Sequence, residues 1–147
     1  MEKTKAIFIA ALLLISSNIL VSKVSADATA TEFELLPSDV VTQNGTQITV
    51  SVYVTPQDSM SVDSLTVYNL EFSKNILQVD EVTKGSILQG SGFELWDDGT
   101  INNNNGTIQD ILWSWQGASA SDPGYFANIT FNVTAPGSAY ILSLIHI

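Results

Sequence analysis

The sequence predicts an all-β protein, a β-sandwich built from two antiparallel sheets. Apolar and polar residues alternate with period two along much of the chain, which is typical of strands that turn one face to a core. Turn signals such as Asn44-Gly45, Pro56-Gln57-Asp58 and Pro136-Gly137 separate these short runs. Apolar stripes with the 3.6-residue helical period never exceed two turns, so we expect eight short strands arranged as a sandwich.

The alternation is clearest in residues 47–55 (QITVSVYVT) and 125–134 (YFANITFNVT). Within each segment every second residue is apolar, so each strand is expected to cover one side of the core. Weaker alternation predicts six further strands, at Glu32–Leu36, Leu65–Phe72, Ile76–Val82, Phe93–Trp96, Thr107–Trp115 and Ala139–Leu144.

The first 26 residues have the features of a secretory signal peptide. Lys3 and Lys5 precede an apolar run that begins at Ala6, and Val24-Ser25-Ala26 offers the short side chains that a signal peptidase requires. A membrane anchor is the alternative, but polar residues at 16–18 interrupt a stretch that would need about 20 apolar residues. We therefore expect a signal peptide at 1–26 and a single secreted, extracellular domain at 27–147.

Composition narrows the possible partners of this domain. The chain has no cysteine, so disulfides are excluded and a hydrophobic core must supply the stability. After residue 26 there are fourteen acidic residues and two lysines, a net charge of −12. Nucleic acid is therefore not an expected partner, because phosphate binding needs Lys and Arg. A soluble acidic surface is favoured over a calcium site, since Asp97-Asp98-Gly99 is as readily explained as a turn.

Catalytic chemistry finds little support. A Ser-His-Asp arrangement needs an imidazole, and the only histidine, His146, lies in the last few residues, which we do not expect to be native. A zinc site is not expected either, because the chain has neither a cysteine nor a second histidine. A pair of carboxylates could serve a glycosidase, and Glu94 with Asp97 or Asp110 is the one grouping to consider. A small sandwich offers no deep cleft to hold such a pair, so we expect no catalytic residues, no metal and no cofactor.

Three segments resemble the cohesin domain in their order and spacing. Residues 65–88 (LTVYNLEFSKNILQVDEVTKGSIL) match a strand ending in an aromatic residue, a tight turn, a second strand and a glycine step. Residues 44–54 (NGTQITVSVYV) and 124–142 (GYFANITFNVTAPGSAYIL) resemble an earlier strand and a late strand pair of the same family. The resemblance extends from Phe33 to Leu142, although Ser73-Lys74 stands where the family often has Asp-Pro.

This resemblance implies a jelly-roll type sandwich that binds dockerins, which are small calcium-loaded helical modules of glycoside hydrolases and other secreted proteins. The calcium would belong to the dockerin, and the role would be linked to polysaccharide breakdown in an extracellular or cell-surface complex. The chain stops where the family adds its ninth strand. We therefore expect the last strand to be missing and any surface attachment to lie in a C-terminal region beyond this sequence.

The family binds dockerins through the sheet of its strands 8, 3, 6 and 5, and strand parity suggests which side chains face outward there. If Tyr68, Leu70 and Phe72 point inward, the outward residues of that strand include an apolar pair for the partner's helices. If Ile111, Trp113 and Trp115 point inward, polar residues of the next strand join them. The expected partner-binding residues are Leu65, Val67, Asn69, Glu71, Asp110, Leu112 and Ser114. The opposite parity would place Leu65 and Val67 in the core.

Two other functions remain open from the sequence. Trp96, Trp113 and Trp115 would form a carbohydrate-binding platform if they were exposed, although alternating large aromatic residues on a sandwich strand favour the core. The domain could also be a structural spacer of a surface protein. Four glycosylation sequons begin at Asn44, Asn105, Asn128 and Asn132. Glycans at Asn128 and Asn132 are expected on the sheet opposite the dockerin surface.

Overall fold

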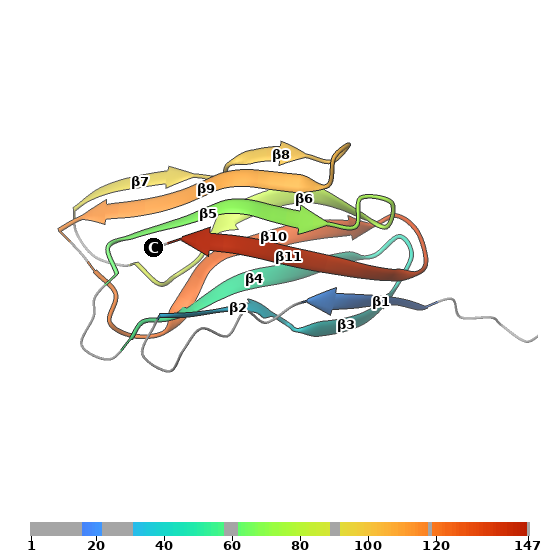
Figure 1. Ribbon diagram of the computed structural model, residues 1–147, viewed down its shortest axis with the longest axis horizontal. Coiled ribbons are helices and arrows are strands. Elements are labelled where there is room, and N and C mark those ends of the chain that lie inside the picture. Colours follow the sequence, from blue (N-terminus) through green and yellow to red (C-terminus); the bar gives the residue numbers. More distant parts are fainter. Residues whose placement is uncertain (1–15, 22–30, 58–61, 89–91, 118, 147) are drawn as a thin grey trace, which may run out of the picture.

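The computed structural model describes residues 16–21, 31–57, 62–88, 92–117 and 119–146. Within these residues the regular secondary structure consists of β-strands alone. The strands form two sheets packed face to face, which confirms the predicted sandwich (Figure 1). One sheet has seven strands and the other has four. In this described part of the chain, no helix is long and apolar enough to cross a membrane.

The seven-stranded sheet has the order β3-β1-β11-β5-β9-β7. Strand β8 also pairs with β9, on the same side as β7: β8 lies along residues 107–109 of β9, and β7 lies along residues 112–116. Neighbouring strands of this sheet are antiparallel, except that β1 and β11 are parallel. Its strands are β1 (Ser16–Val21), β3 (Asp39–Gln43), β5 (Ser64–Phe72), β7 (Phe93–Asp97), β8 (Thr100–Asn102), β9 (Thr107–Gln116) and β11 (Ser138–His146).

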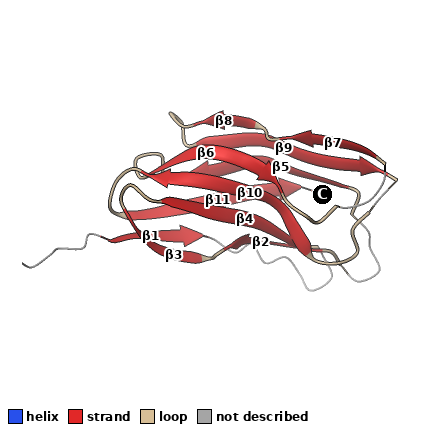
Figure 2. Ribbon diagram, turned by 180° about the vertical axis from the view of Figure 1, so that it is seen from behind, coloured by secondary structure: helices blue, strands red, loops and turns tan. Residues whose placement is uncertain are grey.

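The four-stranded sheet has the order β2-β4-β10-β6 and is seen from its outer side in Figure 2. Its strands are β2 (Glu32–Leu36), β4 (Gln47–Thr55), β6 (Leu77–Lys84) and β10 (Gly124–Val133). Alternate residues of β4 and β10, among them Val50, Val52 and Ile129, are fully buried. Phe72 and Phe131 join the two sheets edge to face, with ring centroids 5.4 Å apart. The core therefore lies between the sheets, as the alternation in β4 and β10 predicted.

All eight predicted strands are confirmed, and they correspond to β2, β4 to β7 and β9 to β11. The sequence did not predict the three short strands β1, β3 and β8. In β3 the reason is visible, because Val40 packs against the core while the next residue, Val41, is exposed. Apolar residues on both faces of a short strand leave no alternation to detect.

Strand β1 lies inside the predicted signal peptide. It pairs antiparallel with β3 and parallel with β11, so β11 has a neighbour on both sides rather than the unpaired edge that a missing last strand would leave. Cleavage after Ala26 would remove β1 from the sheet. In the processed chain β3 would then lose its only partner strand in the sheet, and β11 would gain a free edge.

The two sheets are also joined at one flank by the turn that follows β8. The side-chain amide of Asn103 pairs with the backbone of Val79 on β6. The Val79 N–H donates to Asn103 Oδ1 over 2.7 Å, and Asn103 Nδ2 donates to the Val79 carbonyl over 3.0 Å. Because β6 is an edge strand, Asn103 satisfies one peptide of that edge and links it to the other sheet.

A second link between the sheets involves Lys84 on β6. Its ammonium lies 2.5 Å from Glu94 Oε1 on β7 and 5.5 Å from the ring centroid of Trp113 on β9. The ammonium therefore contacts both a carboxylate and an aromatic face, and these contacts link β6 of one sheet to β7 and β9 of the other.

Candidate docking surface

Exposed apolar side chains gather on the outer face of the seven-stranded sheet. Among the described residues, the large hydrophobic side chains with high exposure on this sheet are Val41, Tyr68, Phe93, Leu95, Tyr140 and Leu142. The four-stranded sheet has one, Tyr125. The apolar surface of this sandwich is thus strongly one-sided, and exposed apolar patches on folded proteins commonly mark interaction sites.

Strands β7 and β11 each turn two neighbouring apolar side chains outward. On β7, Phe93 and Leu95 face outward because Trp96 packs against the core and Glu94 reaches Lys84. Phe93 is 68% exposed. On β11, Tyr140 and Leu142 face outward because Ala139 and Ile141 are buried. Each strand therefore contributes an apolar ridge two residues long.

Strand register places the two ridges at opposite corners of the face. Leu142 lies opposite Glu71 on β5, whereas Leu95 lies opposite Ser114 on β9, which in turn lies opposite Ser64 on β5. The ridges are thus about 23 Å apart along the strands and about 14 Å apart across them. Exposed Tyr68 and half-buried Leu112 lie between them. We call the line formed by these residues the apolar diagonal: Tyr140, Leu142, Tyr68, Leu112, Leu95 and Phe93.

A break in the pairing of β5 with β9 lies in the middle of this diagonal. Val67 pairs with Ile111 and Asn69 pairs with Gln109, but Tyr68 and Asp110 between them are outside the ladder. Tyr68 is also the extra residue where β11 shifts its register against β5. Asp110 has a φ of 60°, a left-handed conformation that is uncommon for a residue with a Cβ. We call this pair of residues the matched bulge.

The matched bulge overturns part of the predicted site. Each strand gains one residue outside the alternation, so the inward residues of β5 are Leu65 and Val67 before it and Leu70 and Phe72 after it. Leu65 and Val67 were predicted to contact the partner, but they are 1% and 0% exposed and belong to the core. Tyr68 was predicted to point inward and is instead 49% exposed.

The other expected partner-binding residues are at least partly accessible, and they stay predictions as contacts. Glu71 and Asp110 are exposed, and Leu112, Ser114 and Asn69 are half-buried. As expected, Ile111 and Trp113 point into the core and Trp115 packs against it. The residues that sequence reasoning missed are the two ridges. The signal for them was weak, because β7 and β11 carry apolar residues on both faces.

Carboxylates give this face a negative charge. Asn69 Nδ2 donates to Glu71 Oε1 over 3.0 Å, and Asp97 Oδ1 accepts from the Gly99 N–H over 2.9 Å. The Asp110 carboxylate makes no hydrogen bond or ion pair with any described residue. Neither lysine after residue 26 lies on this face: Lys74 donates to the Asn104 carbonyl at the end of the sandwich, and Lys84 pairs with Glu94.

The expected tryptophan platform for carbohydrates does not form. Trp113 is 1% exposed, and its ring lies edge to face with Trp96 at a centroid distance of 5.8 Å. Trp96 and Trp115 are only partly buried, but both pack against the core. With the middle ring of the three sealed between the sheets, these tryptophans do not form a flat surface for sugar rings to stack on. The expected platform of Trp96, Trp113 and Trp115 is therefore wrong.

The outer face of the four-stranded sheet is polar and its side chains bond to one another. Ser51 Oγ donates to Asn128 Oδ1 over 2.7 Å, and Gln47 Nε2 donates to both Asp80 and Asn132. Asn128 and Asn132 therefore lie on strand β10 of the sheet opposite the apolar diagonal. The sequon residues Asn44 and Asn105 are exposed in turns at the ends of strands.

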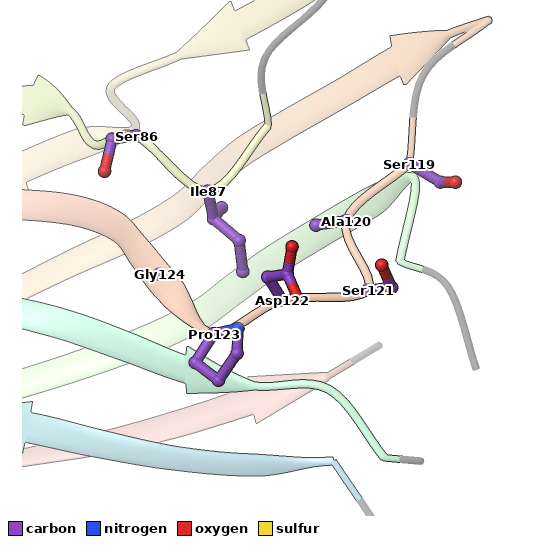
Figure 3. A pocket seen from close by; sticks show the side chains of 8 residues that line it. All are labelled: Ser86, Ile87, Ser119, Ala120, Ser121, Asp122, Pro123 and Gly124. Carbon is purple, nitrogen blue, oxygen red and sulfur yellow. The ribbon is translucent and has the colours of Figure 1, made fainter. Parts of the chain in front are cut away.

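A hollow of about 420 Å³ opens at one end of the sandwich, between the segments that precede β7 and β10 (Figure 3). It is lined by Ser86, Ile87, Ser119, Ala120, Ser121, Asp122, Pro123 and Gly124. Asp122 is its only carboxylate, and the Glu94 carboxylate considered for catalysis is instead paired with Lys84. The hollow therefore offers no pair of acids for glycoside hydrolysis.

Comparison with known proteins agrees with the fold. The family model for the cohesin domain matches residues 33–145, and the chain belongs to the cohesin family. No curated protein matches the chain.

Solved structures with the same fold include three cohesins. One is the OlpA cohesin in a complex with Doc918 from Clostridium thermocellum, with a TM-score of 0.57, 18% identity, and coverage of 79% of this chain and 82% of that chain. A type II cohesin complex with an X-dockerin from Acetivibrio cellulolyticus has a TM-score of 0.59 at 12% identity, covering 78% and 76%. The seventh ScaB type I cohesin from Pseudobacteroides cellulosolvens has a TM-score of 0.52 at 15% identity, covering 89% and 75%. At these identities the likeness concerns the fold alone.

Proposed function

We propose that this chain is a non-catalytic docking module that binds dockerin-bearing proteins through the outer face of β11, β5, β9 and β7. The observation that carries the proposal is the apolar diagonal, which gives one sheet an exposed apolar surface that the other sheet lacks. Membership of the cohesin family supports a dockerin as the partner. Two of the solved structures with the same fold are cohesins in complex with dockerins, which also supports a dockerin as the partner.

The dimensions of the face suit a helical partner. The diagonal between Leu142 and Leu95 measures about 27 Å, roughly the length of a helix of 18 residues. Two helices packed about 9 Å apart would cover the four strands, whose outer members are about 14 Å apart. Affinity would come from burying the two ridges, with Asn69, Glu71 and Asp110 as polar contacts and Leu112 and Ser114 between them.

The setting proposed for this activity is extracellular. Residues 1–26 would be removed on secretion, and the domain at 27–147 would act in a secreted or cell-surface complex linked to polysaccharide breakdown. Calcium would be carried by the dockerin, because dockerins are calcium-loaded modules, and no cofactor is proposed for this domain. A role as a spacer in a surface protein is the competing function, and it predicts no dockerin binding.

The test is a binding screen. The purified secreted chain is immobilised and exposed to every dockerin module encoded in the genome that carries it, with calcium and then with a chelator. Docking predicts at least one dockerin that is retained in calcium and released by the chelator. If every folded, calcium-loaded dockerin passes through unbound, the docking function is wrong and the spacer function takes its place.

A further inference from the structure

The matched bulge holds a strained residue at the centre of the face. Asp110 has a φ of 60°, which brings its Cβ close to the following carbonyl oxygen and is disfavoured for any residue other than glycine. Asp and Asn tolerate this conformation best when the side chain bonds to nearby backbone. The Asp110 carboxylate has no such bond within the described residues.

Strain of this kind persists where function requires it, and bulges redirect side chains at binding sites. Here the bulge turns two neighbouring residues outward on each strand: Tyr68 with Asn69, and Gln109 with Asp110. A tyrosine ring and a carboxylate therefore lie opposite one another in the sheet, midway along the apolar diagonal. Because residues directly opposite one another in an antiparallel pair share a face, both side chains lie on the outer face beside each other.

The chain shows elsewhere what such a pair can hold. Lys84 meets a carboxylate, Glu94, and an aromatic ring, Trp113, at the same time. Tyr68 and Asp110 offer the same two groups, but neither lysine after residue 26 is available to them, because Lys74 and Lys84 are held by Asn104 and Glu94. Because residues 1–26, which hold the other three lysines, would be removed on secretion, a cation that completes this site would come from another molecule.

We propose that Asp110, with Tyr68 opposite it, is the specificity-determining residue of the docking face and receives a Lys or Arg side chain from the partner. This inference rests on the docking function proposed above and adds the chemistry of one contact to it. The partner's surface would carry a cation flanked on both sides by apolar side chains. Burial of the two ridges around the contact would exclude water and strengthen the ion pair.

Three substitutions separate the charge of Asp110 from its backbone conformation. Asp110→Asn removes the charge but tolerates the left-handed conformation, Asp110→Gly removes the side chain and the strain, and Asp110→Ala removes the side chain and keeps the strain. Glu81→Gln, an exposed position on β6 of the other sheet, is the charge-matched control. The probe is the tightest-binding dockerin from the screen, titrated calorimetrically at low and high salt.

At low salt we expect Asp110→Asn and Asp110→Gly to weaken binding by about tenfold or more, with a flatter salt dependence, while Glu81→Gln binds like the unchanged protein. Urea unfolding gives an independent readout, in which Asp110→Ala unfolds at lower urea than Asp110→Gly. If the unchanged protein binds a dockerin and Asp110→Asn binds it equally well, the inference is wrong and docking stands. If the unchanged protein binds no dockerin, docking itself is wrong.

A double-mutant cycle identifies the cation. Each Lys and Arg of the probe dockerin is changed to Ala and titrated against the unchanged chain and against Asp110→Asn. One position should lose about tenfold in affinity with the unchanged chain and far less with the variant. If every basic position costs the same affinity against both proteins, no cation contacts Asp110 and the inference is wrong.

Discussion

The two sheets of this sandwich have similar inner faces and very different outer faces. Both bury alternate apolar residues in a common core. On the four-stranded sheet Tyr125 is exposed, but most outer side chains are small or polar, and several bond to one another, as Ser51 does with Asn128. On the seven-stranded sheet the outer face carries the apolar diagonal and the Asp110 carboxylate, which has no partner among the described residues. A sandwich needs only its inner faces to fold, so an outer face with so much exposed apolar surface points to a partner.

The same contrast appears in the regularity of the ladders. Strand β4 alternates along its whole length, and its outer residues form a continuous polar surface. Strands β5 and β9 are interrupted together at Tyr68 and Asp110. Departures from regular geometry that the core does not require are expected at functional positions, which places the matched bulge and the apolar diagonal in one site.

The largest expected effect tests which residues of β5 face the core. Leu65→Ala should lower the free energy of unfolding by about 3 kcal/mol, because it removes a fully buried side chain and leaves a cavity. Thr66→Ala, the neighbouring outward position, should change it by less than about 0.5 kcal/mol. Chemical denaturation of both variants measures the difference. Equal effects would mean that the inner and outer faces of β5 have been assigned wrongly.

The next prediction compares the two outer faces directly. Changing both Phe93 and Leu95 to Asp should weaken dockerin binding by at least about a hundredfold, because one ridge of the diagonal becomes charged. The control is Tyr125→Asp, which adds one negative charge, against two in the double variant, at an exposed aromatic residue of the other sheet. Calorimetric titration of the dockerin that binds in the screen measures both. A larger loss for Tyr125→Asp would move the docking surface to the four-stranded sheet.

These two experiments also separate what the sequence predicts well from what it predicts poorly. The sandwich and its eight main strands follow from period-two patterning, because burying one face of a strand imposes that period. The outward residues of β5 could not be predicted, since the alternation reverses at Tyr68 and nothing in the sequence marks an Asp as left-handed. Strands β7 and β11 carry apolar residues on both faces, so the pattern alone did not mark Phe93, Leu95, Tyr140 and Leu142 as outward-facing.

A smaller effect is expected at the flank that joins the two sheets. Asn103→Ala removes both hydrogen bonds to the Val79 peptide and should lower the free energy of unfolding by about 2 kcal/mol. Asn104→Ala, at the exposed next position, should cost less than about 0.5 kcal/mol. Thermal or urea unfolding provides the comparison. Dockerin affinity should be unchanged in both variants, since neither side chain lies on the apolar diagonal.

The smallest expected effect concerns glycans on the polar sheet. In a host that glycosylates Asn44, Asn105, Asn128 and Asn132, mass spectrometry should find the exposed turn residues Asn44 and Asn105 occupied, and also Asn128 and Asn132 if transfer precedes folding. Dockerin affinity of glycosylated and unglycosylated protein should agree within about twofold, because Asn128 and Asn132 lie on β10, in the sheet opposite the diagonal. A glycan at either position that blocked binding would show that the partner covers the four-stranded sheet. The polar outer face would then be the functional one, and the apolar diagonal would need another explanation.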